Sequence, residues 1–187
     1  MKQALHWAPM ELPNVMAIAK EMQLFVLLRR LARFGKFSRT PFRQVITGQV
    51  ADLGAFLEGL EEAARERPGF LDPLQRVMPL HFTFPFLGEE DFRREIGERL
   101  PEVAARLPGD RFYVRFARRG VPAASLGFDV EREVGGLLEA ELRRQGRTPK
   151  VAFADPDAVV TIETAGAAGG IGLIVRELLA RPYLKVR

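Results

Sequence analysis

Residues 14–86 carry apolar segments whose periodicity alternates between that of strands and that of helices, and this order restricts the possible folds strongly. Short β-branched or alternating runs predict strands, whereas leucines spaced three and four residues apart predict amphipathic helices. The expected order is strand, helix, strand, helix, strand, over residues 14–19, 21–34, 41–50, 52–67 and 76–86. The pattern leaves open one further strand near residues 36–40. This order indicates a ferredoxin-like α+β unit.

The second half of the chain has its own apolar pattern and predicts an α/β domain. A helical stripe interrupted at Pro101 predicts two short helices, because proline lacks the amide that a helix interior requires. The remaining pattern predicts strands over residues 112–116, 150–154, 158–164 and 183–186, and helices over 129–145 and 173–180. A glycine-rich link precedes the last helix. We therefore expect two domains, residues 1–87 and 88–187.

The composition limits the chemistry available to the chain. Among its 187 residues there is no cysteine, which excludes disulfides, thiolate nucleophiles and cysteine-held metal clusters. No apolar run approaches the roughly 18 residues of a membrane span. The N-terminus lacks the long apolar stretch of a signal peptide, so we expect a cytoplasmic protein.

The positive charge is concentrated in two places. Of the 28 basic residues 23 are arginines, whose planar forks suit phosphate oxygens. Residues 22–51 contain six cations and no acidic residue, and a second group ends the predicted strand at 112–116. These groups predict a polyanionic partner, although a merely compositional excess of arginine is the alternative. The candidate RNA-binding residues are Arg29, Arg30, Arg33, Lys36, Arg39, Arg43, Arg115, Arg118, Arg119, Lys150 and Arg176.

Signals for catalysis are weak throughout the chain. The glycines of residues 166–172 do not have the spacing of a dinucleotide-binding loop, and we interpret them as a flexible connector. His81 lies on a predicted strand and is more typical of a packed histidine than of a general base. Asp155 and Asp157 flank a proline, as ordinary turn residues do. We therefore predict no catalytic residue, no cofactor and no metal.

Three segments of the second half resemble a THUMP domain, the RNA-binding module of tRNA-modifying proteins. They are FYVRFARRG at 112–120, FDVEREVGGLLEAEL at 128–142 and KVAFADPDAVVTIET at 150–164. In the first half, GKFSRTPFRQVITGQV and RVMPLHFTFPF resemble the ferredoxin-like partner that precedes THUMP in many members. One departure is the loop after Gly120, which reads VPAAS and lacks a basic residue that often follows in the family.

The resemblance implies tRNA recognition at the acceptor end. Because the chain is similar to standalone THUMP proteins that present tRNA to an RNA cytidine acetyltransferase, it implies a non-catalytic adaptor and not an enzyme. Two alternatives remain at this point. One is a small RNA-modifying enzyme that uses His81 or the Asp155 and Asp157 pair, and the other is a protein–protein scaffold without RNA affinity of its own.

Overall fold

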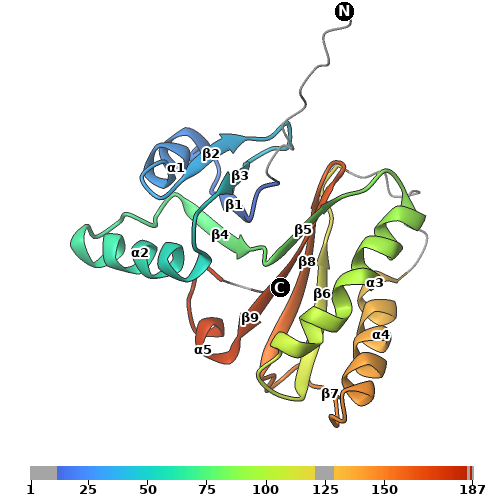
Figure 1. Cartoon of the computed structure of the whole chain (residues 1–187). Coiled ribbons are helices and arrows are strands. Elements are labelled where there is room, and N and C mark those ends of the chain that lie inside the picture. The colour runs from blue at the N-terminus through green and yellow to red at the C-terminus, as the bar shows by residue number, and fades with distance from the viewer. Residues whose placement is uncertain (1–11, 121–128, 185, 187) are drawn as a thin grey trace, which may run out of the picture.

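The computed structural model describes residues 12–120, 129–184 and 186, and these form two β-sheets with helices packed on them (Figure 1). The first sheet has the strand order β2-β3-β1-β4, with antiparallel neighbours throughout. Its elements are β1 (Val15–Ala19), α1 (Leu24–Leu31), β2 (Lys36–Arg39), β3 (Val45–Gln49), α2 (Leu53–Glu66) and β4 (Leu74–Pro79). This is the predicted ferredoxin-like arrangement, and β2 is the strand that the pattern left open near residues 36–40.

The two helices of this half pack on the same sheet and enclose a core. Leu27 and Leu31 of α1 are buried with Leu57 and Leu60 of α2. Asp52 caps α2, because its side chain accepts a hydrogen bond from the Ala55 amide at 2.7 Å. A separate apolar cluster, made of Met16, Val45, Met78 and Leu80, lies outside this core.

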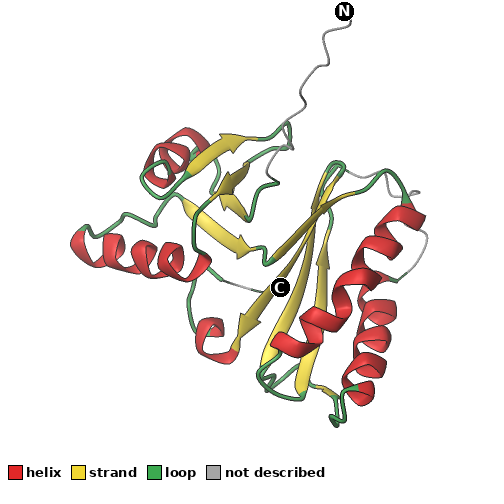
Figure 2. Cartoon of the chain, in the orientation of Figure 1, coloured by secondary structure: helices red, strands yellow, loops and turns green. Residues whose placement is uncertain are grey.

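The second sheet has the strand order β5-β9-β8-β6-β7 and mixes parallel with antiparallel neighbours. Helices α3 and α4 run beside each other on one side of it (Figure 2). The elements of this half are β5 (Phe82–Pro85), α3 (Glu89–Arg106), β6 (Arg111–Ala117), α4 (Val130–Arg144), β7 (Lys150–Val151), β8 (Ala158–Ala165), β9 (Ala168–Val175) and α5 (Arg176–Leu179). The predicted fold class, an α+β chain in which an α/β unit follows a ferredoxin-like unit, is confirmed.

The single strand predicted over residues 76–86 is wrong, because the chain crosses there from one sheet to the other. Leu80 and His81 separate β4 from β5, and each donates its amide to a different neighbour. The Leu80 amide bonds to the Asn14 carbonyl and the His81 amide to the Ile171 carbonyl, both at 2.8 Å. The alternating pattern continues through the crossing, so it could not reveal the change of sheet.

The glycine-rich segment is a strand and not a connector, and the helix expected over residues 173–180 shortens to α5. Strand β9 needs small residues because other groups occupy the space beside it. A Cβ on Gly169 would lie 2.5 Å from the Phe84 ring, and one on Gly172 would lie 2.3 Å from the Pro79 carbonyl oxygen. The glycines therefore let β4 and β5 approach β9 closely.

Several element boundaries also differ from the predictions. Helix α3 continues through Pro101 as one helix, and no strand forms among the described residues 183, 184 and 186. Instead, Tyr183 and Leu184 join the core of the first sheet. The two sheets separate between Pro79 and Phe82, and the division into domains 1–87 and 88–187 stays a prediction. Within the described part of the chain, no helix is both long enough and apolar enough to cross a bilayer.

Candidate nucleic-acid interface

The hairpin that joins β2 and β3 reaches across to the second sheet through Phe42. A Cβ on Gly120 would lie 2.1 Å from the Phe42 ring, and one on Gly166 would lie 3.5 Å from it. Both glycines have positive φ, at 77° and 62°, so each combines a left-handed backbone with a close aromatic neighbour. The hairpin cations Arg39 and Arg43 therefore lie in the same region as the segment that ends in Gly120. The contact at this point is made by Phe42 and the backbone, whereas Arg43 pairs with Glu21 at 2.5 Å.

Three predicted RNA-binding residues, Arg29, Arg30 and Arg33, line a concavity together with Phe70. Arg67, which is not among the predicted residues, lines it as well. The concavity encloses about 410 Å³ and is lined by Val26, Arg29, Arg30, Arg33, Arg67 and Phe70. We call it the arginine concavity. Arg30 is fixed there because its Nη1 donates to the carbonyls of Gly69, at 2.5 Å, and Phe70. The guanidinium of Arg33 lies 5.2 Å from the Phe34 ring centre and 5.9 Å from that of Phe70.

Among the residues that the structure describes, no acidic one lines the arginine concavity. Because guanidinium groups held on aromatic rings keep their N–H donors available, the concavity can accept phosphate oxygens. Arg67 directly follows α2 and precedes Pro68, and in the sequence it follows the acidic Glu66. In the folded chain Arg67 lies beside the arginines of α1. Only this spatial proximity identifies Arg67 as a candidate RNA-binding residue.

Arg119 forms part of a buried ion cluster between the two sheets. Its Nη1 donates to Glu163 Oε2 at 2.6 Å, and Arg76 of β4 donates to Glu163 Oε1 at 3.1 Å. The Glu163 side chain is only 3% exposed. This geometry does not support Arg119 as an RNA contact, because its guanidinium is bound to a carboxylate and lies 3.6 Å from the Met16 sulfur.

Burial raises the pKa of Glu163, although the two arginines oppose the shift. A carboxyl group that holds its proton more tightly when folded stabilises the protein fully below about pH 4.5, and this contribution disappears as the pH rises through the folded-state pKa. We therefore expect wild type to lose stability relative to Glu163→Gln as the pH rises above about 4.5. Thermal melts of both proteins at a series of pH values measure the difference in stability. The other carboxyl groups are the same in both proteins, so their contributions to the difference cancel. A difference that stays constant or grows in favour of wild type would contradict the assignment.

The other predicted RNA-binding residues of the second half are separated from one another. Arg115 pairs with Glu131 at 3.3 Å and lies over the Tyr113 ring, with the Arg115 Cζ 5.6 Å from the ring centre. Arg176 pairs with Asp155 and, at 2.9 Å, with Asp157. Lys150 is exposed on β7. Arg118 is exposed and adjoins Arg119. The VPAAS loop, named above as a departure from the family pattern, lies outside the described residues.

The residues of the alternative enzyme hypothesis do not come together. His81 Nδ1 accepts the Leu173 amide at 3.1 Å, and burial lowers the pKa of His81. Asp155 and Asp157 both bind Arg111 and Arg176, and hydrogen bonds from Arg111 hold the pKa of Asp157 far below its usual value. Such a carboxylate is a poor proton donor or acceptor near neutral pH. The described residues contain no cluster of His, Asp and Glu that could hold a metal ion.

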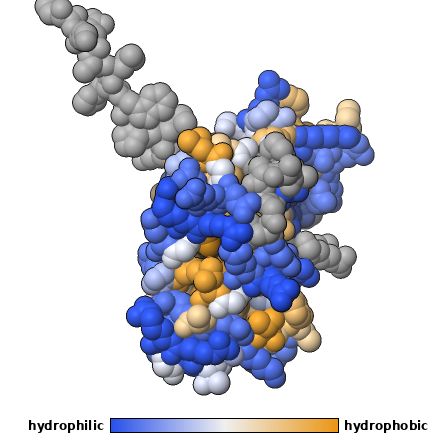
Figure 3. Space-filling view, turned by 90° about the vertical axis from the view of Figure 1, so that its right-hand side faces the viewer, coloured by the Kyte–Doolittle hydropathy of each residue, from blue (hydrophilic) through white to orange (hydrophobic). Residues whose placement is uncertain are grey.

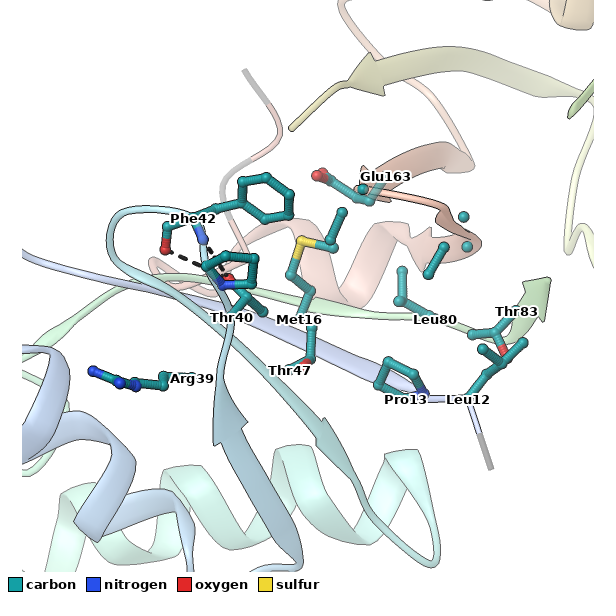
Figure 4. A pocket seen from close by; sticks show the side chains of 16 residues that line it. Leu12, Pro13, Met16, Arg39, Thr40, Phe42, Thr47, Leu80, Thr83 and Glu163 are labelled. Carbon is teal, nitrogen blue, oxygen red and sulfur yellow. Dashed lines mark hydrogen bonds between the residues drawn. The ribbon is translucent and has the colours of Figure 1, made fainter. Parts of the chain in front are cut away.

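A cleft of about 340 Å³ lies between the sheets beneath the β2–β3 hairpin. Met16 lies between Phe42 and Leu80 on its wall, and Glu163 lies at one end (Figure 4). Arg39 contributes to the rim, where its guanidinium points away from Met16 (Figure 4). The cleft is lined mostly by apolar groups from both sheets.

A ferredoxin-like sheet, followed by a mixed sheet with two helices on one side, defines this chain as an α+β protein with a THUMP-like fold. Solved structures with this arrangement include TrmN from Thermus thermophilus, with a TM-score of 0.57 and 18% identity, covering 85% of this chain and 44% of that chain. PH1313 from Pyrococcus horikoshii Ot3 gives a TM-score of 0.55 and 11% identity, over 85% of this chain and 53% of that one. A 4-thiouridine synthetase in complex with RNA and bound ATP gives a TM-score of 0.53 and 14% identity, over 87% of this chain and 41% of that one.

This chain therefore spans about half of each similar structure or less. No family model matches the sequence, and no curated protein matches it. The prediction that the chain is not an enzyme is wrong on these comparisons, because the similar proteins include a thiouridine synthetase. The lack of a recognisable catalytic motif was insufficient ground for that prediction, since the chain matches only part of such a protein.

Proposed function

We propose that this chain is a tRNA-binding module that holds tRNA for a modifying active site. The observation that carries the proposal is the arginine concavity, which four arginines line and no carboxylate of the described residues lines. Phosphate contacts of this kind position a nucleic acid without reading its sequence. The likeness in fold to a synthetase solved with RNA supports the same function.

The resemblance to THUMP proteins makes the proposal more specific. We propose that the acceptor end of tRNA is the part held, and that an RNA cytidine acetyltransferase is one candidate for the enzyme that receives it. His81 and the Asp155 and Asp157 pair are engaged in structural contacts, so we do not assign the modifying reaction to these residues. The proposal also keeps the expected cytoplasmic location.

A salt titration of tRNA binding tests the proposal. Removing one phosphate-binding side chain should reduce the slope of log K against log salt by about 1. We expect Arg29→Ala/Arg33→Ala/Arg67→Ala to reduce that slope by about 2 to 3 and to weaken binding more than about tenfold near 100 mM salt. Filter binding with a transcribed tRNA, between about 50 and 200 mM salt, measures both quantities.

The matched control removes the same charge from another part of the molecule. Arg106, Arg143 and Arg144 are exposed on α3 and α4, and each pairs with a carboxylate of its own helix. Arg106→Ala/Arg143→Ala/Arg144→Ala should therefore bind tRNA nearly as wild type does. Equally weakened binding in the two triple variants would show that only net charge matters. Salt-insensitive or absent binding by wild type would favour a scaffold without RNA affinity.

A further inference from the structure

Phe25 is a large apolar side chain that the fold leaves in solvent on the outer face of α1. It is 66% exposed, whereas Leu27 and Leu31 of the same helix are buried in the core. Exposure alone does not define a site, because apolar patches also interrupt the hydrophilic surface on the side that carries α3 and α4 (Figure 3). The charged neighbours of Phe25 distinguish it from those patches.

Helical spacing puts Phe25 beside the arginine concavity. Phe25 and Arg29 are four residues apart in α1, so they share one face of the helix and are about 6 Å apart along its axis. Arg29 lines the concavity together with Val26, the residue that follows Phe25. Phe25 itself does not line it. An exposed ring therefore lies beside the concavity, one helical turn from its first guanidinium group.

The cations of this surface are not neutralised by carboxylates. Arg29, Arg33 and Arg67 are exposed, and none of them has an ion-pair partner among the residues that the structure describes. Glu21, which lies in the turn before α1, is paired with Arg43. A phosphate group beside Phe25 would therefore meet guanidinium groups that have no competing anion.

The other aromatic side chains of this region are engaged in packing. The ring centres of Phe34 and Phe70 lie 6.3 Å apart, and Phe70 is buried. The ring centre of Phe37 lies 5.9 Å from that of Phe56 in the core. Of the aromatic residues in the basic segment 22–51, Phe25 is the one that is exposed.

An exposed ring next to unpaired arginines fits an unpaired nucleotide. Proteins that bind single strands combine cations along the backbone with aromatic rings on which bases stack. A base inside a duplex is covered by its neighbours, so its face cannot reach a side chain. A protein partner is less suitable, because a stable interface covers about 800 Å² of each partner. Here α1 and the turn before it expose only two large apolar side chains, Met22 and Phe25.

We propose that Phe25 stacks on an unpaired base of RNA, while Arg29, Arg33 and Arg67 bind the phosphates next to this base. The ligand is RNA with a single-stranded end or loop, and a blunt duplex contacts the arginines alone. This inference rests on the proposed function, because it uses the same arginine concavity and names the form of RNA that the concavity takes.

Fluorescence titrations of the full chain with two synthetic RNAs test the proposal. One is a single-stranded octanucleotide with 2-aminopurine at its centre, and the other is a blunt duplex that contains the same strand. We expect a saturable change in 2-aminopurine fluorescence with the single strand. Phe25→Ala should weaken binding of the single strand about 5- to 100-fold and binding of the duplex less than about twofold. An equal loss for both RNAs, or no loss for the single strand, would overturn the proposal.

Two further variants separate stacking from a structural effect. Phe25→Trp keeps an aromatic face and should bind the single strand at least as tightly as wild type does. Phe153→Ala is the matched control, because Phe153 is 67% exposed but follows β7 and does not line the arginine concavity. It should leave binding of both RNAs unchanged. Equal losses in Phe25→Ala and Phe153→Ala, or failure of Phe25→Trp to bind, would contradict a stacking site at Phe25.

Other partners give different results with the same variants. If Phe25→Ala loses binding to phosphatidylcholine vesicles that contain phosphatidylserine but keeps RNA binding, the surface binds membranes and the proposal fails. Self-association that requires Phe25, with RNA binding unchanged, would assign the surface to a second copy of the chain and overturn the proposal as well.

The results also distinguish this inference from the proposed function. If tRNA binding requires the three arginines but single-strand binding does not depend on Phe25, only the stacking site fails. If the single strand binds through Phe25 while wild type shows no salt-sensitive tRNA binding, the proposed function fails and the stacking site remains.

Discussion

Gly172→Val should lower the free energy of unfolding by about 3 kcal/mol, because it forces a side chain into the junction between the two sheets. A Cβ at this position would lie 2.3 Å from the Pro79 carbonyl oxygen and 2.5 Å from Thr161 Oγ1. Pro79 belongs to the end of β4, and Thr161 is the register partner of Gly172 in β8. The Pro79 carbonyl belongs to the backbone of β4, which pairs with β1, so it cannot move without disturbing a sheet.

Urea denaturation followed by far-UV circular dichroism measures the change. Gly97→Ala is the control, since a Cβ there meets no atom within 4 Å and lies in helix α3. We expect this control to raise stability by about 0.5 to 1 kcal/mol. If the free energy of unfolding falls in Gly172→Val and rises in Gly97→Ala, the loss is due to steric crowding at Gly172 and not to glycine replacement in general. An unchanged midpoint for Gly172→Val would show that β4 and β9 do not approach as closely as described.

The ferredoxin-like half could be predicted well because its information is local. Leucine spacing identified α1 and α2, and a short apolar run and a β-branched run identified β1 and β3, since each pattern requires only neighbouring residues. The pattern left β2 open, and alternation over residues 76–86 merged β4 with β5. The same reasoning failed at residues 166–172, where glycine frequency suggested a connector. A Cβ atom at those glycines would clash with Pro79, Leu80 or Phe84, which lie in another part of the sequence. No local sequence pattern could reveal this steric constraint.

The candidate site shows the same limit for charges. Arg29, Arg30 and Arg33 were identified from a segment without acidic residues, and they do line one concavity. Arg119 was selected for its neighbours in sequence, but its partner Glu163 comes from β8. Arg67 is separated from the basic segment in sequence by α2, so a local charge count does not connect the two. Local charge counts find basic segments, whereas the pairing of each guanidinium depends on contacts between distant strands.

Phe92→Ala should cost about 3 to 5 kcal/mol, which is a large part of the stability of a small protein. Phe92 of α3 is fully buried. Its ring centre lies 5.9 Å from that of Phe84, 5.0 Å from that of Phe86 and 5.9 Å from that of Phe116. Truncation leaves a cavity among three rings that strands and chain connections hold in place. Phe92→Leu is the matched control and should cost less, because it fills most of that space.

The same variant tests whether the two predicted domains unfold separately. Independent domains would give two transitions, with only the second half destabilised by Phe92→Ala. We expect one transition, because the halves share contacts on both sides of their junction. Tyr183 packs in the first core and its carbonyl accepts the Val77 amide at 2.8 Å, while Arg76 binds Glu163 across the sheets. Hydrogen exchange of α2 and α3 amides distinguishes the cases: equal acceleration in both helices indicates one cooperative unit, and acceleration confined to α3 indicates two.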